Sequence, residues 1–234
     1  VLTRSFNDMT QEIGGLVEDI KQQQKNLRIA ETKLLQAQIN PHFLYNTLDA
    51  IVWLAEENRK DEVVSMVTAL SDFFRTTLSK GRDFITVREE RSHIESYLKI
   101  QQFRYQDIMS YEIDMEENMG EFMIPKLTLQ PLVENAILHG LEGCENGYIC
   151  IYAGREGDVL NISITDNGCG MSPEILAWIN SPEPEKRDGH LGLYNIMRIL
   201  KLYYGNEYGL KAEVTEDGTT VTLSLPVRME GDDV

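Results

Sequence analysis

The chain has 234 residues, of which 42% are hydrophobic, and a formal net charge of −16. This composition supports a buried core and excludes an intrinsically disordered chain. The chain has 38 acidic and only 22 basic residues. This balance argues against nucleic acid or an anionic membrane surface as a partner, because both attract basic patches. A nucleotide needs only a local site and stays possible.

The cysteines and the first residues of the chain bear on its cellular compartment and on its relation to a longer protein. Cys144, Cys150 and Cys169 form no CxxC pair, which predicts reduced thiols in a cytoplasmic compartment. No apolar run reaches the roughly 18 residues of a membrane span, and no signal peptide is recognised. Since the chain begins at Val1 in the middle of a helical pattern, we interpret it as a piece of a longer protein.

The first predicted element is a long helix with an apolar seam over residues 9–37. Its apolar residues alternate in steps of four and three, which is typical of a coiled coil. Such a seam needs a partner, and its regularity favours a parallel pair formed by two copies of the chain. An ordinary amphipathic helix packed on its own domain is the alternative. One core position is occupied by Ile13, Ile20, Leu27 and Leu34.

The stretch QAQINPHFLYNTLDAI (36–51) continues this seam through a proline. Pro41 cannot donate a backbone hydrogen bond, so a bend is predicted there. His42 falls one residue past the seam, where solvent can reach its imidazole. A second helix is predicted over 61–81, ending at Gly81. The two stretches form a helical hairpin, and two hairpins make a four-helix bundle.

The remaining pattern mixes helices and strands, which predicts an α+β sandwich with helices on one face of a sheet. The segment 180–192, rich in Gly and Pro, is a candidate lid. The predicted elements are a helix over 87–105 with Thr86 as N-cap and Glu89 in its capping box, a strand over 111–116, a helix over 124–142, a hairpin over 148–168, a short helix capped by Ser172, a helix over 190–205 ending at Gly205, and a hairpin over 210–227 turning at Asp217-Gly218.

Four polar clusters in this second half fit a nucleotide site. A phosphate site needs glycines for close backbone approach and gains from a helix N-terminus, where GHLGLYN is placed. The side-chain oxygen of Asn135 suits a Mg²⁺ that rides on phosphates. A buried carboxylate such as Asp166 can accept a hydrogen bond from an adenine amino group. The clusters are Glu134-Asn135 with His139-Gly140, DNGCGM (166–171), GHLGLYN (189–195) and GTT (218–220).

Taken in order, these motifs make the sequence resemble sensor histidine kinases of the LytS/YesM-like group. INPHFLYNTLDAI resembles the phosphoacceptor box of that group, and LQPLVENAILHG resembles its N box. DNGCGM resembles the G1 box, GHLGLYN the G2 box, and DGTTVTLSLP the closing hairpin of a GHKL-type ATP-binding domain. The resemblance extends over residues 36–228, and residues 1–35 resemble the signalling helix of membrane-bound members.

The resemblance assigns roles to individual residues. It implies that His42 is the phosphorylated histidine and that Asn135 holds Mg²⁺ on the bound ATP. His139 is then near the phosphates and Asp166 reads the adenine. The other implied ATP-binding residues are Gly168 and Gly170 around the adenine pocket, Gly189, Gly192 and Asn195 at the lid and phosphate edge, and Thr219 near the adenine end.

Two departures from the family pattern stand out. Many histidine kinases carry an acid directly after the histidine, whereas Phe43 follows here, so the general base is open; Glu134 is our candidate. In the G2 box, Asp188 and His190 replace two glycines, which predicts a less pliant lid. His93 is predicted to lie in solvent or to cap its helix, and His190 to belong to the lid and take no part in catalysis.

The resemblance also implies an architecture and a set of partners. The expected regions are a signalling coiled coil (1–35), a helical region for dimerisation and phosphotransfer (36–108) and an α/β sandwich ATP-binding domain of the GHKL or Bergerat type (109–234). The expected reaction is ATP-dependent autophosphorylation followed by transfer to an aspartate of a response regulator receiver domain. A homodimer is expected, as the cytoplasmic portion of a bacterial membrane protein. An ATPase of the gyrase or chaperone type and a non-catalytic ATP-gated scaffold are the alternatives.

Overall fold

The computed structural model describes residues 41–77, 82–105, 108–141, 144–187, 189–216 and 218–231. The predicted coiled-coil seam, the bend at the entry to Pro41 and the helix stop at Gly81 rest on residues outside these ranges. Among the helices of the described ranges, none combines the length and the apolar character needed to cross a membrane.

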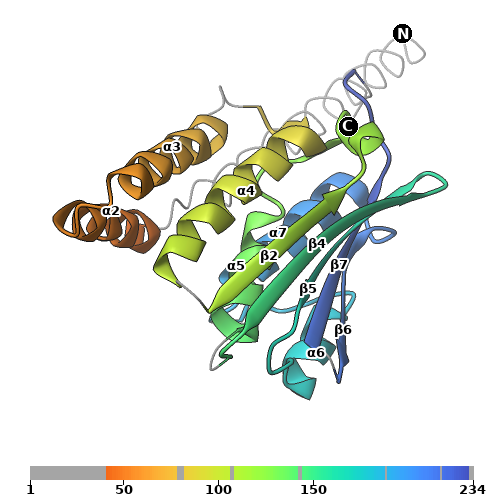
Figure 1. Ribbon diagram of the computed structural model, residues 1–234. Coiled ribbons are helices and arrows are strands. Elements are labelled where there is room, and N and C mark those ends of the chain that lie inside the picture. The colour runs from red at the N-terminus through yellow and green to blue at the C-terminus, as the bar shows by residue number, and fades with distance from the viewer. Residues whose placement is uncertain are drawn as a thin grey trace, which may run out of the picture. The chain divides into compact units, whose positions relative to one another are not determined.

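Three helices, α2 (Pro41–Glu56), α3 (Lys60–Thr77) and α4 (Val87–Arg104), form the first part of the described chain (Figure 1). Asn58 turns the chain between α2 and α3 with a φ of 58°, a left-handed conformation that asparagine tolerates. The predicted helical hairpin is therefore present. At the start of α4, Thr86 and Glu89 form the predicted capping box: the Thr86 hydroxyl accepts the Glu89 N–H at 3.1 Å, and the Glu89 carboxylate accepts the Thr86 N–H at 3.0 Å.

The second part is a five-stranded sheet. Its strands, in their order across the sheet, are β2 (Met109–Met115), β4 (Gly147–Glu156), β5 (Val159–Asp166), β7 (Gly218–Pro226) and β6 (Gly209–Thr215). Its side chains alternate between the two faces: Ile149 and Ile151 of β4 are fully buried, whereas Tyr148 and Tyr152 are exposed. Helices α5 (Gln130–Asn135) and α7 (Leu191–Tyr204) lie over the same side of the sheet in Figure 1.

This two-layer arrangement confirms the predicted α+β class. The short helix α6 (Pro173–Ile179) begins at Ser172, whose hydroxyl accepts the N–H of Ile175. Helix α7 ends at Gly205, whose φ of 74° only glycine adopts without strain. Strand β2 runs parallel to β4, so the chain between them makes a crossover, which includes the 3₁₀ helix η1 (Glu117–Met119), α5 and the π-helix η2 (Ala136–Gly140).

The helix predicted over 124–142 was wrong in its first part. Strand β3 (Met123–Pro125) pairs antiparallel with β1 (Phe84–Thr86), and α5 begins only at Gln130. Between them, Leu127 has a φ of 59°, which interrupts any helix. The fully buried carboxylate of Glu90 on α4 accepts the backbone N–H groups of Leu127 and Leu129 at 3.1 and 2.9 Å. A side chain distant in the sequence thus holds this turn.

We expect Glu90→Ala to lower the free energy of unfolding by about 3 kcal/mol, because it leaves two buried N–H groups without an acceptor. Urea unfolding measures the loss. Glu95→Ala, at an exposed position of the same helix, is the matched control and is expected to change the free energy by less than about 0.5 kcal/mol. Equal losses in the two variants would contradict the role of Glu90.

Candidate functional site

The helical segment over 130–140 carries the first group of predicted site residues. Asn135 is buried at the end of α5, and Glu134 beside it is partly buried. The chain then widens into the π-helix η2, a form that is common at functional sites, and this places His139 on the exposed surface. Burial raises the pKa of Glu134, and a hydrogen bond from the Gln130 amide at 2.8 Å partly opposes that rise.

Asp166 ends strand β5, and its side chain is only 3% exposed. Its carboxylate accepts the backbone N–H of Gly168 at 3.0 Å and interacts with the backbone N–H of Thr219 on the neighbouring strand β7. Burial raises the pKa of Asp166, while these two N–H groups act in the opposite direction. The ionised form is therefore an anchored acceptor, as recognition of an amino group requires.

Three glycines crowd around Asp166 so closely that no side chain fits. A Cβ atom at Gly140 would lie 2.6 Å from the Asp166 carboxyl carbon, and one at Gly168 would lie 1.6 Å from the carbonyl oxygen of Gly140. A Cβ atom at Gly218 would lie 1.8 Å from the carbonyl oxygen of Asp166. Gly168 was predicted as a site residue, whereas Gly140 and Gly218 were only part of the quoted motifs. Gly170, also predicted, turns the chain with a φ of 81°.

The residues of GHLGLYN surround the start of α7. Gly189 has a φ of 83°, and His190 precedes the helix without a capping bond from its side chain, which leaves the first N–H groups of α7 to other acceptors. A Cβ atom at Gly192 would lie 3.0 Å from Cβ of Pro131, so α7 packs closely on α5. The rings of His139 and His190 have centroids 5.2 Å apart, which brings the N-box end and the lid end together.

Two buried polar atoms of this region suit a ligand. The Asn195 side-chain oxygen and the Thr219 hydroxyl are buried without a hydrogen-bond partner among the described residues. Unsatisfied buried polar groups are costly, and a bound polar molecule would satisfy them. With the anchored carboxylate of Asp166 and the glycine contacts around it, these atoms fit a nucleotide. The structure brings together Asp166 with Gly168 and Thr219, and separately the two histidines near the α5–α7 contact.

His42 lies apart from this group, on the exposed side of α2. The Asn46 amide, one turn further along the helix, is 3.2 Å from its Nδ1. The next residue, Phe43, is buried, with its ring centroid 5.0 Å from that of Phe73 on α3 and 5.2 Å from that of Tyr97 on α4. Neighbouring residues of a helix point about 100° apart, so the buried phenylalanine fixes the imidazole outward.

Family models match the chain in two regions. A histidine kinase model matches residues 30–109, and a model of histidine kinase-, DNA gyrase B- and HSP90-like ATPases matches residues 124–229. The exposed His42 lies in the first region, and the nucleotide-type site lies in the second. The chain belongs to the histidine kinase family.

Curated relatives of the chain agree with the two family models. It is 37% identical to the sensor histidine kinase YesM of Bacillus subtilis, over 98% of this chain and 39% of YesM. It is 33% identical to the sensor histidine kinase BtsS of Escherichia coli, over 92% of this chain and 36% of BtsS, and 33% identical to the sensor protein LytS of Streptococcus mutans, over 91% of this chain and 37% of LytS. The chain thus spans about two fifths of the length of these relatives.

A solved structure is also similar. The histidine kinase domain of a blue-light activated histidine kinase from Erythrobacter litoralis aligns with 88% of this chain and 94% of its own, with 13% identity and a TM-score of 0.47.

The structure corrects one prediction made for the chain. His93 does not lie in solvent and does not cap its helix: its side chain is fully buried. Its ring stacks on Phe73 with centroids 4.5 Å apart, and its Nε2 is 2.9 Å from the side-chain oxygen of Gln130. The charged neighbours of His93 in the sequence suggested an exposed position. In the structure, His93 is instead buried together with Ile94, Tyr97 and Leu98 of the same helix.

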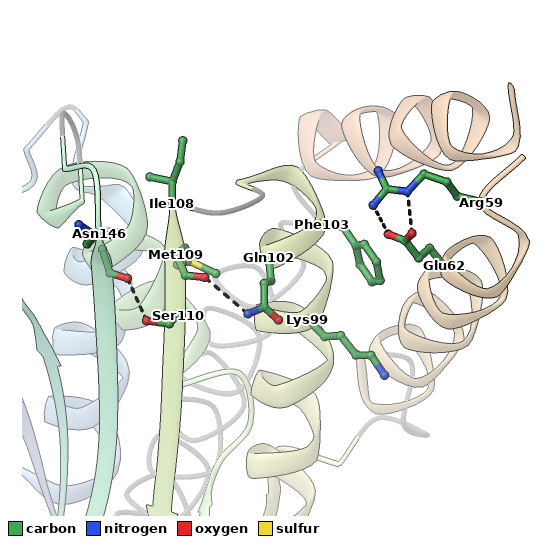
Figure 2. Close-up of a pocket in the computed structure, with 10 residues that line it drawn as sticks. Arg59, Glu62, Lys99, Gln102, Phe103, Ile108, Met109, Ser110 and Asn146 are labelled. Atoms are coloured by element: carbon green, nitrogen blue, oxygen red, sulfur yellow. Dashed lines mark hydrogen bonds and ion pairs between the residues drawn. The ribbon is translucent and has the colours of Figure 1, made fainter. Parts of the chain in front are cut away.

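A pocket of about 680 Å³ lies elsewhere in the chain, between the α2–α3 turn, the end of α4 and the starts of β2 and β4 (Figure 2). Arg59 and Glu62 on its rim form a two-point ion pair at 2.5–2.6 Å, and Gln102 donates to the carbonyl of Met109. None of the predicted site residues lines this pocket, and the volume alone assigns it no chemistry.

Proposed function

We propose that this chain is the kinase part of a two-component sensor, in which His42 is phosphorylated by ATP and passes the phosphoryl group to an aspartate of a response regulator. The observation that carries the proposal is the exposed imidazole of His42 above the buried ring of Phe43, inside the histidine kinase region. The nucleotide-type site in the ATPase region supplies the second substrate.

Each residue of the site receives a role in this proposal. Asp166 accepts a hydrogen bond from the adenine amino group, and Gly168, Gly170 and Thr219 shape that end of the pocket. Asn135 provides the oxygen for Mg²⁺, which neutralises phosphate charge when it is bound. Near the phosphates lie His139 from the N box and the lid and helix-start residues Gly189, Gly192 and Asn195.

In the proposed reaction, a ring nitrogen of His42 attacks the γ-phosphorus of ATP. A nitrogen–phosphorus bond forms while the bond from phosphorus to the bridging oxygen breaks, and ADP leaves. Neutral imidazole is a competent nucleophile near pH 7. The protein contributes mainly by positioning the reactants and by neutralising charge.

We assign Glu134 as the base that takes the imidazole proton. Phe43, the residue after the histidine, cannot take a proton, so the base must come from another position. Glu134 lies next to α4, because the Gln130 side chain that donates to it is also 2.9 Å from His93 of that helix. Phe43 of the phosphoacceptor helix packs on Tyr97 of the same helix, with ring centroids 5.2 Å apart. The residues around Glu134 and the phosphoacceptor helix thus both contact α4.

The proposal includes a homodimer of the helical region. Leu48 and Val52 of α2 are 45% and 56% exposed, and Val64 and Val67 of α3 are 65% and 49% exposed. Apolar residues clustered on a helical hairpin mark a protein interface. The wider proposal keeps the regions 1–35, 36–108 and 109–234 as signalling helix, dimerisation and phosphotransfer helices and ATP-binding domain, in a membrane-anchored protein with Pro41 as the bend that transmits the signal.

We expect Val52→Glu to weaken this dimer at least tenfold, because the interface would have to bury an unpaired charge. Sedimentation at several protein concentrations measures the association. Met229→Glu, at an exposed apolar position near the end of the described chain, is the control and leaves the association unchanged. A Val52→Glu protein that associates like the wild type would place the dimer contact on another surface.

The proposed function is tested by incubating the wild type and His42→Gln with Mg²⁺ and ATP labelled at the γ-phosphate. Acid-labile and base-stable label on the wild type alone is the expected result. Steady phosphate release that does not need His42 would favour the ATPase alternative. Nucleotide binding without label or release would favour the ATP-gated scaffold, and either of these results rejects the kinase.

A further inference from the structure

Helix α6 is fixed to the edge of the sheet beside β6 (Figure 1). Asn180, the residue after the helix, donates its side-chain amide to the carbonyl of Ala212 on β6 at 2.9 Å and accepts the N–H of Ala212 at 3.0 Å. Ile179 is only 1% exposed, and Trp178 beside it packs against the hydrophobic core. The side chains of α6 therefore start from a fixed base.

The indole of Trp178 holds the segment 181–187, which follows α6 and is the first part of the candidate lid. Its ring N–H donates to the backbone carbonyl of Glu185 at 2.7 Å. Residues 181–187 form neither a helix nor a strand, so contacts with neighbouring elements determine where this segment lies. We call the hydrogen bond from Trp178 to Glu185 the Trp178 latch.

Two ion pairs tie the same segment to its neighbours. Arg187 pairs with Glu174 of α6 at 2.9 Å, and Glu183 pairs with Lys201 of α7 at 3.2 Å. The side chains of Glu174 and Glu183 are 76% and 84% exposed, and exposed ion pairs contribute little to stability. The Trp178 latch, whose ring packs against the core, is therefore the main tie of this segment.

A row of aromatic rings leads from the latch to the nucleotide-type site. The ring centroid of His190 is 5.8 Å from that of Trp178 on one side and 5.2 Å from that of His139 on the other. His139 precedes Gly140, where an added Cβ atom would lie 2.6 Å from the Asp166 carboxyl carbon. The row thus ends beside the residue that contacts the Asp166 carboxylate.

Polar groups at the start of α7 suit the phosphate groups of a nucleotide. The Nδ1 atom of His190 is buried without a hydrogen-bond partner among the residues that the structure describes. The side chain of His190 also makes no capping bond to the helix that follows it. A ring N–H and the backbone N–H groups of a helix N-terminus both donate to phosphate oxygens. The placement of His190 therefore affects the phosphate end of the site.

We propose that Trp178 is a positioning residue for the phosphate groups of ATP: through the latch and its contact with His190, it holds the start of α7 in the arrangement that binds them. The inference rests on the proposed function and adds a residue to its nucleotide site. Groups that are held in place before binding lose less conformational freedom when the ligand arrives, which favours affinity. The adenine end, with Asp166 and Thr219, is built from β5 and β7 and does not depend on the latch.

The experiment compares Trp178→Phe and Trp178→His with the wild type in the full 234-residue chain. The first variant keeps an aromatic ring and removes the N–H, whereas the second keeps a ring N–H at about the position of the indole nitrogen. Trp53→Phe is the matched control, because Trp53 is the other tryptophan of the chain and is 49% exposed on α2, outside the ATPase region. Isothermal titration calorimetry measures the dissociation constants for a non-hydrolysable ATP analogue and for adenosine.

We expect Trp178→Phe to raise the dissociation constant for the ATP analogue about tenfold and to change that for adenosine less than about twofold. Adenosine has the adenine without the phosphates, so a loss confined to the phosphate end leaves its binding intact. Trp178→His recovers most of the affinity for the analogue, and Trp53→Phe keeps both wild-type constants. An unchanged constant for the analogue in Trp178→Phe, or an equal loss for the analogue and adenosine, would overturn the inference.

A second measurement needs no nucleotide and separates this inference from the proposed function. Trypsin cleaves after Lys186 and Arg187 when the segment 181–187 opens far enough to enter the protease. Cleavage at these two bonds, identified by mass spectrometry, should be about fivefold faster in Trp178→Phe than in the wild type and in Trp53→Phe. Equal rates reject the latch even if the wild type forms phosphohistidine. A wild type that binds ATP and forms no phosphohistidine rejects the proposed function, while faster cleavage and weaker ATP binding in Trp178→Phe still support the latch.

Discussion

Gly168→Ala is expected to abolish nucleotide binding and to lower the free energy of unfolding by about 3 kcal/mol. The new Cβ atom would lie 1.6 Å from the carbonyl oxygen of Gly140 and 2.2 Å from its carbonyl carbon. Both are backbone atoms, and the N–H of Cys169 donates to the same carbonyl at 3.1 Å. The loop that carries Gly168 can make room only by moving away from Gly140 at the end of η2. Isothermal titration calorimetry with a non-hydrolysable ATP analogue and thermal unfolding measure the two losses.

Gly157→Ala provides the matched control for this substitution. Gly157 is at the tip of the β4–β5 hairpin, where an added Cβ atom meets no other atom within 4 Å. Its φ of 59° costs an alanine about 1 kcal/mol, so stability falls slightly and nucleotide binding stays. Binding within threefold of the wild type in Gly168→Ala would show that the close approach to Gly140 is dispensable.

Asp166→Asn is expected to raise the dissociation constant for ATP about a hundredfold, which corresponds to roughly 2.7 kcal/mol. The carboxylate accepts from the N–H of Gly168 and still has acceptor sites for an adenine amino group. An amide must turn its NH₂ group toward one of these donors. Because GTP has a carbonyl group where ATP has the amino group, the variant should also discriminate less between the two nucleotides. Competition binding with ATP and GTP measures both effects.

The pH dependence of binding checks the same carboxylate. Burial raises the pKa of Asp166, so its protonation begins at higher pH than for an ordinary aspartate. Affinity for ATP should therefore fall as the pH is lowered through this raised pKa, and Asp166→Asn should lack that part of the pH dependence. Asp158→Asn, on a fully exposed side chain in the β4–β5 turn, is the control and should bind like the wild type. A pH dependence that persists in Asp166→Asn would assign it to another group.

The elements predicted from the sequence are those whose signals are local. The capping box of Thr86 and Glu89, the cap at Ser172 and the stop at Gly205 depend on residues within one turn of a helix end. The two hairpins likewise have their turn residues between their own strands. The residues of the nucleotide-type site could be proposed from the sequence because they lie in short motifs, whereas the close approach of Gly140, Gly168 and Gly218 around Asp166 is seen only in the structure.

The features that were missed depend on distant parts of the chain. Strands β1 and β3 have three residues each, and their pairing joins residues 84–86 to 123–125, so neither segment shows its conformation alone. The turn at Leu127 exists because Glu90 holds it from another helix. The burial of His93 likewise depends on packing against Phe73 of α3. The charged residues next to His93 in the sequence show no periodic pattern that would reveal this contact.

The parallel pairing of β2 with β4 has a consequence for the order of folding. Helix α5 lies within the crossover that joins these two strands. Edge strand β2 can therefore take its place only after this long loop has closed, whereas the β4–β5 and β6–β7 hairpins form from neighbouring residues. When hydrogen exchange is followed during refolding, the amides of β2 and α5 should gain protection together and late. The nucleotide-type site would then be completed in the last step of folding.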